Sequence, residues 1–484
     1  MTTATAPFPS RRAQSARVSL VVAGFVAGIL LLILVRQAAV LRMGFPLASL
    51  GLGIWLYRRA GFATYAAYSW WLWFLVPALR RLVDFQAGRW DPENPMSLAP
   101  FMVSAVALFT VARRVPELRR QQLWSWVVAA GCVGYGYFVG VLRNGVLPAT
   151  HSLIAWFIPL MFGLAIALEW RKYPECAAAI GRAFLWGTLL LSAYAVVQFV
   201  APPSWDRLWV ESSGMRSIGM ALPYQLRVFS LMNGPASFAV FLLAAIYLMF
   251  AQRGAWRIIA LVISVVALML TLVRSAWLAL PIGLLVYLLA LPLRSIQRTL
   301  GVVAMAVLLL WGIPQLLPRE VGGPVVQTIR DRALTLGSIG QDLSYSQRSS
   351  FVDQMSDVVL DDPLGHGLGS TGVSSTLGES GAGIKDFDSG IFAVLYSLGW
   401  FAGAGLLVAA TAIVLLSLGR REARADLTAK AARATLIATF ALSLGGNIFE
   451  GVAAVVFWSF AGLVFAAGQW NVSTGRHRTA SARA

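Results

Sequence analysis

Isolated arginines stand beside long apolar segments of this 484-residue chain, and they are well suited to bind an anion. A guanidinium group stays charged, and its planar fork offers two hydrogen bonds to a phosphate or a carboxylate. A single exposed arginine is also common as a solvated or lipid-binding side chain. The arginines in question are Arg143, Arg216, Arg227, Arg274, Arg330, Arg332 and Arg348.

Arg274 is the only charged residue in the 36 positions from Ile258 to Leu293. As one helix this segment would be roughly 54 Å long, whereas the hydrocarbon core of a bilayer is ~30 Å thick. Two spans that meet in a tight hairpin at Arg274 fit better, and they put the guanidinium at a membrane boundary. A charge there needs a partner, so Arg274 either pairs with an acidic loop residue or binds an anionic ligand.

Other polar residues stand where loops meet predicted spans. Asp388, followed by Ser and Gly before a long apolar segment, has the pattern of a helix N-cap, and it is also a candidate general base for a sugar hydroxyl. Glu450, in the segment GGNIFEGVA, is expected to be a plain loop residue. Arg143 and His151, in RNGVLPATHSL, are candidates to contribute to a cavity near the outer face, but the preferred interpretation is that they are ordinary loop residues.

The segment SYSQRSSFVDQMSDVVLDDPLGHGLGSTG is the most informative part of a long loop. Phe351, Met355 and Val358 recur at helical spacing, which predicts a short amphipathic helix that ends before Pro363. The turn that follows contains His366 and several glycines. Glycines let backbone N–H groups approach an anion closely, but such a turn also serves as a simple helix stop, and both interpretations stay open.

The composition indicates what must position these residues. The chain is 58% hydrophobic and 12% charged, with a mean hydropathy of +0.71, and apolar stretches of membrane-spanning length recur throughout. We therefore expect an all-α polytopic membrane protein, a single transmembrane domain over residues 1–484 with about 14 spans (12–14). The second expected span is short enough to be re-entrant. The spans are expected at 18–35, 44–57, 62–79, 97–112, 123–142, 151–168, 177–200, 234–251, 258–273, 275–293, 299–316, 390–418, 434–448 and 452–468.

The charge distribution sets the expected orientation. With the N-terminus inside, the inner segments hold 23 Lys and Arg against 5 Asp and Glu, whereas the outer ones hold 15 against 16. The positive-inside rule then predicts that both termini are cytoplasmic. It also explains the net charge of +18 by topology and contact with anionic membrane lipids, without nucleic acid. Two long segments, 201–233 and 317–389, become outer loops, the second with the amphipathic helix.

Neither a metal site nor a cofactor is expected. The three histidines, His151, His366 and His477, lie far apart in the chain, and no cluster of metal-ligand spacing accompanies them. Cys132 and Cys176 are placed within one span and at the opposite end of another, so a disulfide between them is not expected.

Four stretches together resemble the O-antigen ligase/polymerase superfamily of bacterial envelope enzymes, over roughly residues 180–470. They are an arginine-led segment before a span, a turn between two helices, a periplasmic helix with its glycine turn, and a segment that returns to the membrane and ends in spaced glycines. Their order and spacing are more specific than any one of them. The stretches are RVFSLMNGPASFAVFL (227–242), LTLVRSAWLAL (270–280), RSSFVDQMSDVVLDDPLGHGLGS (348–370) and DSGIFAVLYSLGWFAG (388–403).

The resemblance implies metal-independent glycan transfer from an undecaprenyl-pyrophosphate carrier at the periplasmic face of the bacterial inner membrane. Arg227 and Arg274 match the arginines thought to hold the pyrophosphate. Ligases of the family carry His-Asn where this chain has Asp388 and Ser389, which favours the polymerase branch. Asp388 would then orient or deprotonate the acceptor.

The first expectation is therefore a polymerase of lipid-linked repeat units for an exopolysaccharide, capsule or O-antigen. Arg348, His366 and Asn233 are expected to help to bind the substrate, and a chain-length regulator and a flippase are candidate partners. The alternatives are a ligase that moves glycan to lipid A core or protein, and a small-anion or solute transporter. A transporter would need charged or broken spans at the membrane midplane, and the sequence offers few beyond Arg182.

Overall fold

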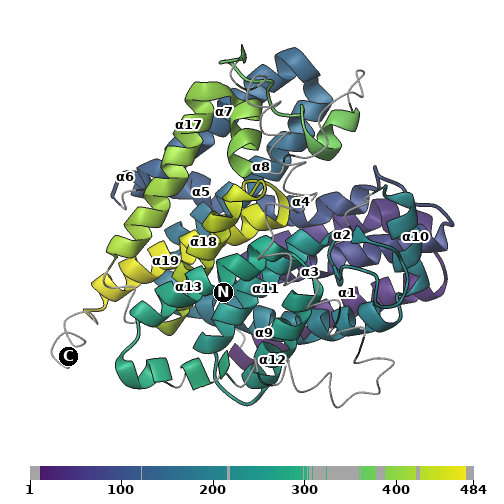
Figure 1. The fold of residues 1–484 in the computed structure, drawn as a ribbon, viewed down its shortest axis with the longest axis horizontal. Helices are drawn as coiled ribbons and strands as arrows, with labels where there is room; N and C mark the ends of the chain where they lie inside the picture. The colour runs from purple at the N-terminus through teal and green to yellow at the C-terminus, as the bar shows by residue number, and fades with distance from the viewer. Residues whose placement is uncertain are drawn as a thin grey trace, which may run out of the picture.

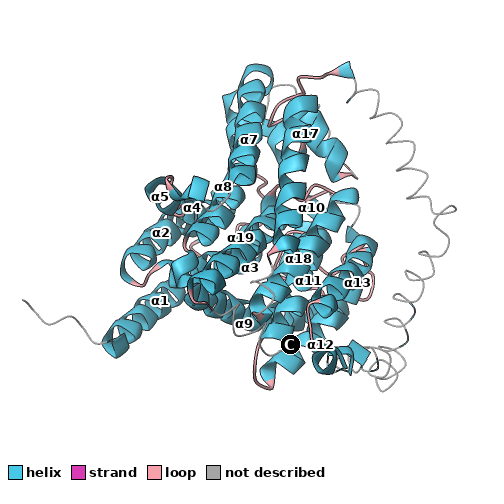
Figure 2. Cartoon of the chain, turned by 90° about the vertical axis from the view of Figure 1, so that its left-hand side faces the viewer, coloured by secondary structure: helices cyan, strands magenta, loops and turns pink. Residues whose placement is uncertain are grey.

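The computed structural model describes residues 11–120, 123–214, 218–297, 361–377, 389–420 and 426–475, with single positions and short stretches between 299 and 387. This described part is built from helices (Figures 1 and 2). Its only β-type pairing is an isolated antiparallel bridge between Gly219 and Leu226. The predicted all-α fold is confirmed.

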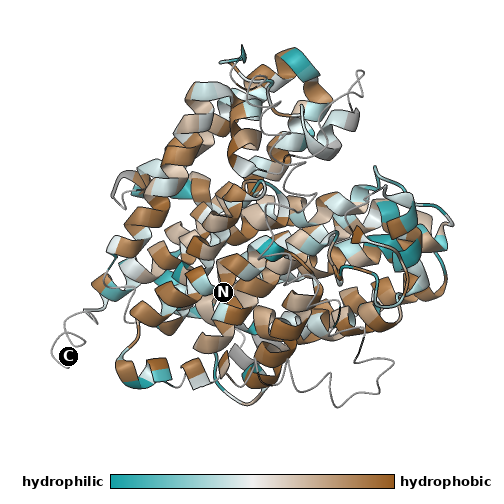
Figure 3. Cartoon of the chain, in the orientation of Figure 1, coloured by the Kyte–Doolittle hydropathy of each residue, from teal (hydrophilic) through white to brown (hydrophobic). Residues whose placement is uncertain are grey.

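Nine helical segments of the described chain are long and apolar enough to cross a membrane, which supports a multi-pass membrane protein. Apolar residues cover most of their length (Figure 3). Three further apolar helices of 15–17 residues are shorter, so a count of fourteen spans is not established. The nine segments are α1 (Arg11–Leu34), α2 (Ala38–Arg59), η1 with α4 and α5 (Pro95–Leu98, Ala99–Ala105, Leu108–Arg113), α7 (Trp124–Asn144), α8 (Val146–Leu168), η2 with α9 (Trp170–Lys172, Tyr173–Val200), α17 (Gly390–Gly419), α18 with η7 (Leu427–Ala441, Leu442–Leu444) and α19 (Gly451–Ser473). The helix α3 (Phe62–Gln86) is also long, but it is not one of these nine.

The three shorter apolar helices are α11 (Pro235–Ala251), α12 (Trp256–Leu270) and α13 (Arg274–Leu289). Every expected span overlaps a described helix except that at 299–316, most of which lies outside the described residues. Small helices α6 (Glu117–Arg120), α10 (Ser204–Ser212) and η5 (Gly372–Leu377) complete the list.

Several boundaries differ from the sequence predictions. The segment 44–57, considered as a re-entrant piece, belongs to the 22-residue helix α2, whose first turns are fixed by a 3.0 Å contact from Arg42 Nη2 to Asp84 Oδ1 of α3. The span expected at 434–448 is shifted toward the N-terminus. It begins at Leu427, where the Asp426 carboxylate caps the helix, and its helical part ends before Gly445.

The segment 143–153 was expected to be a loop, and this prediction was wrong. α7 continues to Asn144 and α8 starts at Val146, so only Gly145, with a φ of 89°, separates them. The polar side chains of Asn144 and His151 suggested a loop, but both have hydrogen-bond partners in a segment that is distant in the sequence. Asn144 Nδ2 donates to the carbonyl oxygen of His366 at 2.8 Å, and His151 Nδ1 lies 2.8 Å from Ser374 Oγ.

The core of the bundle is formed by α8 and α19, which pack along each other. They approach closely at two glycines, because a Cβ at Gly163 would meet the carbonyl group of Trp458 and a Cβ at Gly462 would meet that of Gly163. Small residues at such crossings allow the dense packing that holds membrane helices together. α18 and α11 cover this pair, while α7 and α17 stand side by side beyond it (Figures 1 and 2).

Candidate functional site

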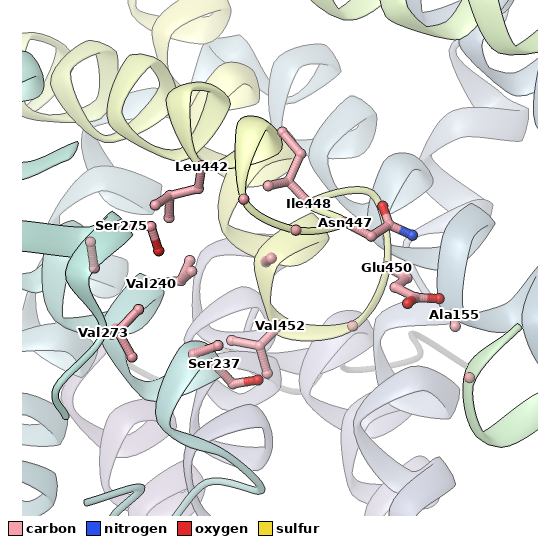
Figure 4. Close-up of a pocket in the computed structure, with 18 of the residues that line it drawn as sticks. Ala155, Ser237, Val240, Val273, Ser275, Leu442, Asn447, Ile448, Glu450 and Val452 are labelled. Atoms are coloured by element: carbon pink, nitrogen blue, oxygen red, sulfur yellow. The ribbon is translucent and has the colours of Figure 1, made fainter. Parts of the chain in front are cut away.

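A cavity of about 390 Å³ lies where α11, α13 and α19 begin, beside the first turns of α8. Ser237 lines it from α11, Ser275 from α13 and Val452 from α19 (Figure 4). Each helix N-terminus carries a partial positive charge of roughly half an elementary charge from its aligned peptide dipoles. Three such ends around one cavity make it attractive to an anion.

The turn between α12 and α13 brings Arg274 to the edge of this cavity. Residues 271–273 form the turn, and Val273 and Ser275 both line the cavity. Arg274 is the first residue of α13, so its charge adds to the positive end of that helix. Leu272 has a φ of 53°, a left-handed conformation that costs energy for a leucine. The tight turn predicted at Arg274 is present, but α12 and α13 do not pack along each other as a hairpin, because α12 packs mainly on α9 and α13 on α18.

Arg227 contacts this same turn. Its Nε donates to the carbonyl oxygen of Thr271 at 3.2 Å, and its Nη2 donates to that of Leu272 at 3.3 Å. The amide of Val228 donates to the carbonyl oxygen of Leu270 at 3.2 Å. The structure thus brings together the two arginine segments that the sequence singled out. These contacts make Arg227 a positioning residue for the turn, and its binding of pyrophosphate stays a prediction.

A buried ion pair anchors the segment between Arg227 and α11. Arg81 of α3 donates from Nε to Asp206 Oδ1 of α10 at 2.8 Å, and both side chains are at most 1% exposed. The rest of the Arg81 fork donates to the carbonyl oxygens of Ser230 and Met232. Burial of a charged side chain costs free energy because the charge loses its hydration. A hydrogen-bonded partner of opposite charge offsets this cost, whereas an unpaired buried charge would strongly destabilise the fold. The region expected to be the outer loop 201–233 is therefore fixed to the bundle just before α11.

The glycine-rich turn after Pro363 packs its backbone against the helices α7, α8 and α17. A Cβ at Gly365, Gly367 or Gly369, where φ is 78°, 79° and 93°, would meet the backbone of those helices. Three amides of the turn donate to protein carbonyl groups. The pairs are Gly365 to Asp362, His366 to Tyr396 and Leu368 to Gly136. The glycines therefore serve close packing, and these three amides are not directed at an anion.

His366 lies in this turn and not on the cavity wall. Its ring stacks on Tyr396 with 3.9 Å between the ring centroids, and its Nδ1 is 3.9 Å from Asp362 Oδ2. Burial lowers the pKa of His366, which favours the neutral imidazole. Asp362 forms an ion pair with Arg143, and this guanidinium holds the pKa of the carboxyl below its usual range. A substrate-binding role for His366 stays a prediction.

Two residues for which the sequence favoured an ordinary loop, His151 and Glu450, line the cavity, and for His151 this was the alternative interpretation. His151 lies in the second turn of α8, with Ser374 of η5 as its partner. Glu450 immediately precedes α19, and its Oε2 accepts a hydrogen bond of 3.2 Å from Trp156 Nε1. Among the described residues that line the cavity, Glu450 is the only acid. The sequence did contain a useful signal, because an acid that follows two glycines and directly precedes a long apolar helix has few polar neighbours.

The other predicted site residues, Asn233, Arg348 and Asp388, are not among the described residues that line the cavity. Asn233 is exposed in the turn just before α11. Arg348, most of the amphipathic helix expected near it, and Asp388 lie outside the described residues. Gly390, the first residue of α17, packs against the carbonyl groups of Ser443 and Gly446. The beginning of α17 therefore meets a wall of the cavity. Within the described chain, no group of three His, Cys, Asp or Glu side chains is arranged to hold a metal ion.

A protein-family model described as O-antigen ligase matches residues 259–407. The match begins in α12, includes Arg274 and the glycine-rich turn, and ends in α17. It includes neither Arg227 nor Glu450. No curated protein matches the chain in sequence.

Proposed function

We propose that this chain polymerises oligosaccharide repeat units carried on undecaprenyl pyrophosphate, and the match of residues 259–407 to the O-antigen ligase family model supports a place in the O-antigen ligase/polymerase superfamily. The donor would be the growing glycan on its carrier, and the acceptor would be the next lipid-linked repeat unit. The product would be an exopolysaccharide, a capsule or an O-antigen.

One observation carries this proposal: the arginine-bearing turn and three helix N-termini meet at one cavity. Ser237, Ser275 and Val452 represent the three helices, and Arg274 starts one of them. An undecaprenyl carrier is an apolar chain with a pyrophosphate headgroup, so it needs positive charge at the end of a membrane bundle. The three helix N-termini and Arg274 supply this positive charge within the helical bundle itself.

The proposed reaction is a displacement at the anomeric carbon of the donor. A hydroxyl oxygen of the acceptor forms a new bond to that carbon, while the bond from the carbon to the pyrophosphate oxygen breaks. The electron pair of the broken bond stays on the pyrophosphate, and the hydroxyl proton moves to a carboxylate. Asp388 is our candidate for that carboxylate, since the resemblance puts it at the acceptor-activating position.

Arg274 would stabilise the negative charge that develops on the departing pyrophosphate. Donors directed at developing charge, in a site of low dielectric constant, contribute more to catalysis than they would in water. Arg227 would hold the turn that carries Arg274, and also contribute to binding. Arg348, His366 and Asn233 complete the proposed substrate-binding set.

We assign the cavity to the periplasmic side of the inner membrane, with both termini in the cytoplasm. The distribution of basic residues supports this orientation, because the segments at the other ends of these helices are the basic ones. A flippase that delivers the lipid-linked unit and a regulator of chain length are the partners that such a polymerase needs.

A ligase is the second candidate, since the matching family model carries that description. A ligase would use the same pyrophosphate site but would transfer the glycan to lipid A core or to a protein. Asp388 argues for the polymerase, because ligases of the family carry a histidine at that position.

The gene would be deleted in its native bacterium, and envelope and secreted glycans would be analysed by gel and mass spectrometry. Complementation would use the wild type, Arg274→Ala, and Arg113→Gln as a matched control far from the cavity. A polymerase predicts loss of long chains and accumulation of single repeat units, rescued by the wild type and Arg113→Gln only. Long chains stranded on the lipid carrier would indicate a ligase. An unchanged glycan profile would reject both and favour transport.

A further inference from the structure

The cavity has two chemically different sides. Val273 and Ser275, next to Arg274, form one side, which we term the phosphate side. Asn447 and Glu450 lie across the cavity from them (Figure 4). A carboxylate beside a pyrophosphate would repel it, so the position of Glu450 on the far side separates the two charges.

Glu450 does not serve as a helix cap, which is the ordinary explanation for an acid at this position. It occupies the N-cap position of α19, yet its side chain makes no capping hydrogen bond there. Its Oε2 instead accepts a hydrogen bond from Trp156, an indole that is buried in the core. This bond orients the carboxylate of Glu450 at the cavity wall, where its oxygen atoms are hydrogen-bond acceptors.

Asn447 supplies complementary hydrogen-bond donors. Its Oδ1 accepts from the amide of Phe449 at 2.9 Å, which fixes the orientation of the side-chain amide. The NH₂ group of Asn447 then has no protein acceptor among the described residues, and the side chain lines the cavity. Hydroxyl groups both donate and accept, so a sugar needs both kinds of partner.

We propose that Glu450 and Asn447 form the subsite that binds hydroxyl groups of the acceptor sugar. This inference rests on the proposed function. It divides the cavity into a pyrophosphate side at the α12–α13 turn and a sugar side at residues 447–450. Glu450 accepts hydrogen bonds from sugar hydroxyls, Asn447 donates to them, and Trp156 holds the carboxylate in place. Asp388 keeps the role of base, so Glu450 governs the binding of the acceptor and not the chemical step.

Two probes, each suited to one side, test this division. Farnesyl pyrophosphate carries the headgroup without sugar, and the repeat-unit oligosaccharide released from its carrier carries the sugar without pyrophosphate. Binding of each would be measured on the full chain in lipid nanodiscs. Glu450→Gln is expected to weaken oligosaccharide binding roughly 10- to 100-fold, the usual effect of losing a charged hydrogen-bond partner, and to change farnesyl pyrophosphate binding less than about twofold. Arg274→Ala is expected to do the reverse.

The matched control is Glu93→Gln, which makes the same chemical change at an exposed loop residue away from the cavity. It should leave both probes unaffected. Trp156→Phe removes the indole N–H that orients Glu450, together with part of a buried ring, and should weaken oligosaccharide binding by about threefold to tenfold with farnesyl pyrophosphate binding kept. In transfer assays Glu450→Gln should raise the acceptor KM, whereas Asp388→Asn should lower kcat.

Unchanged oligosaccharide binding in Glu450→Gln, or a fall in kcat with the acceptor KM unaltered, would overturn the acceptor subsite and leave the proposed function intact. Failure of wild type to bind farnesyl pyrophosphate would instead reject the proposed function. A wild type that binds farnesyl pyrophosphate but not the oligosaccharide would also overturn the subsite.

Discussion

Helix α8 has a cavity at each end, and different helix ends predominate around the two cavities. The first, of about 390 Å³, lies beside His151, where α11, α13 and α19 begin, and the end of α18 with η7 also lines it. The second, of about 420 Å³, lies at Glu169 beyond the last turn of α8, and includes Arg58 and Arg113 from the ends of α2 and α5. His151 and Glu169 are separated by about 27 Å along the helix, close to the thickness of a hydrocarbon core.

The comparison shows that basic residues do not by themselves identify an anion site. The second cavity has several cations, but helix C-termini carry negative partial charge, which these cations offset. Arg114 donates a hydrogen bond to the carbonyl oxygen of Leu168 at 3.1 Å. Arg114 and Lys172 each form an ion pair with Glu169. None of the described residues that line the first cavity is Lys or Arg, yet three helix N-termini meet there and Arg274 stands at its edge.

The largest expected difference between the two ends concerns stability. Arg81→Met should destabilise the protein by about 3–5 kcal/mol, because it leaves the wholly buried carboxylate of Asp206 without its cation. Arg114→Met, the matched change at the second cavity, should cost under about 1 kcal/mol, since Lys172 remains beside Glu169. Fluorescence-detected unfolding in nanodiscs measures both.

The double variant Arg81→Met, Asp206→Leu distinguishes lost pairing from lost packing. It should recover much of the stability that Arg81→Met loses, since no uncompensated charge is left in the core. Equal destabilisation by Arg81→Met and Arg114→Met would contradict the view that the first cavity is the one held by a buried network.

The next largest effect is expected on catalysis. Arg274→Ala should reduce the rate of glycan transfer by about 100- to 1,000-fold, or ~2.7–4 kcal/mol, the usual effect of removing one donor to developing charge. Arg274→Lys should recover only part of this rate, because an ammonium lacks the planar fork. Initial rates with a purified lipid-linked repeat unit measure the loss. A rate within tenfold of wild type for Arg274→Ala would show that charge at this turn is not central.

A smaller effect is expected from pH at the glycine-rich turn. The folded pKa values of Asp362 and His366 are both lowered, so the unfolded state binds more protons and stability rises with pH. The His366 contribution is lost as pH falls below its unfolded pKa of about 6.5, and the Asp362 contribution is lost below about 4. Hydrogen exchange of peptides from 361–377, corrected for intrinsic rates, should show protection at pH 8 that declines at pH 5. Protection that increases on acidification would reverse the assigned sign.

The smallest effect is expected at the second cavity. Arg113→Gln removes an exposed cation from its wall and should change transfer less than about twofold, because exposed charges contribute little. Initial rates under the conditions used for Arg274 provide the measurement. A loss comparable to that of Arg274→Ala would mean that the two ends of α8 are coupled in function.

The sequence predicted the elements whose signal is local. The tight turn at Arg274 followed from one charge within a 36-residue apolar run, because that run is too long for a single span. The all-α fold followed from composition and from repeated apolar stretches. The four segments of the family resemblance gave the arginines, and the structure then brought Arg227 to the turn before Arg274.

The sequence could not predict contacts between residues that lie far apart in the chain. Arg81 and Asp206 are 125 positions apart, so nothing local indicated that each neutralises the other in the core. His151 looked like a loop residue because its partner, Ser374, belongs to another segment. Glu450 was assigned to a plain loop for the same reason, since the cavity that it faces is assembled from several helices.

Binding of farnesyl pyrophosphate to the purified protein in nanodiscs tests the central claim most directly. The measurement would compare the wild type with Arg274→Ala and Arg113→Gln, one variant for each end of α8. Our account predicts that Arg274→Ala weakens binding at least about tenfold, while Arg113→Gln stays within about twofold of the wild type. Weaker binding in Arg113→Gln with none lost in Arg274→Ala would put the anion site at the opposite end of the bundle and contradict the account.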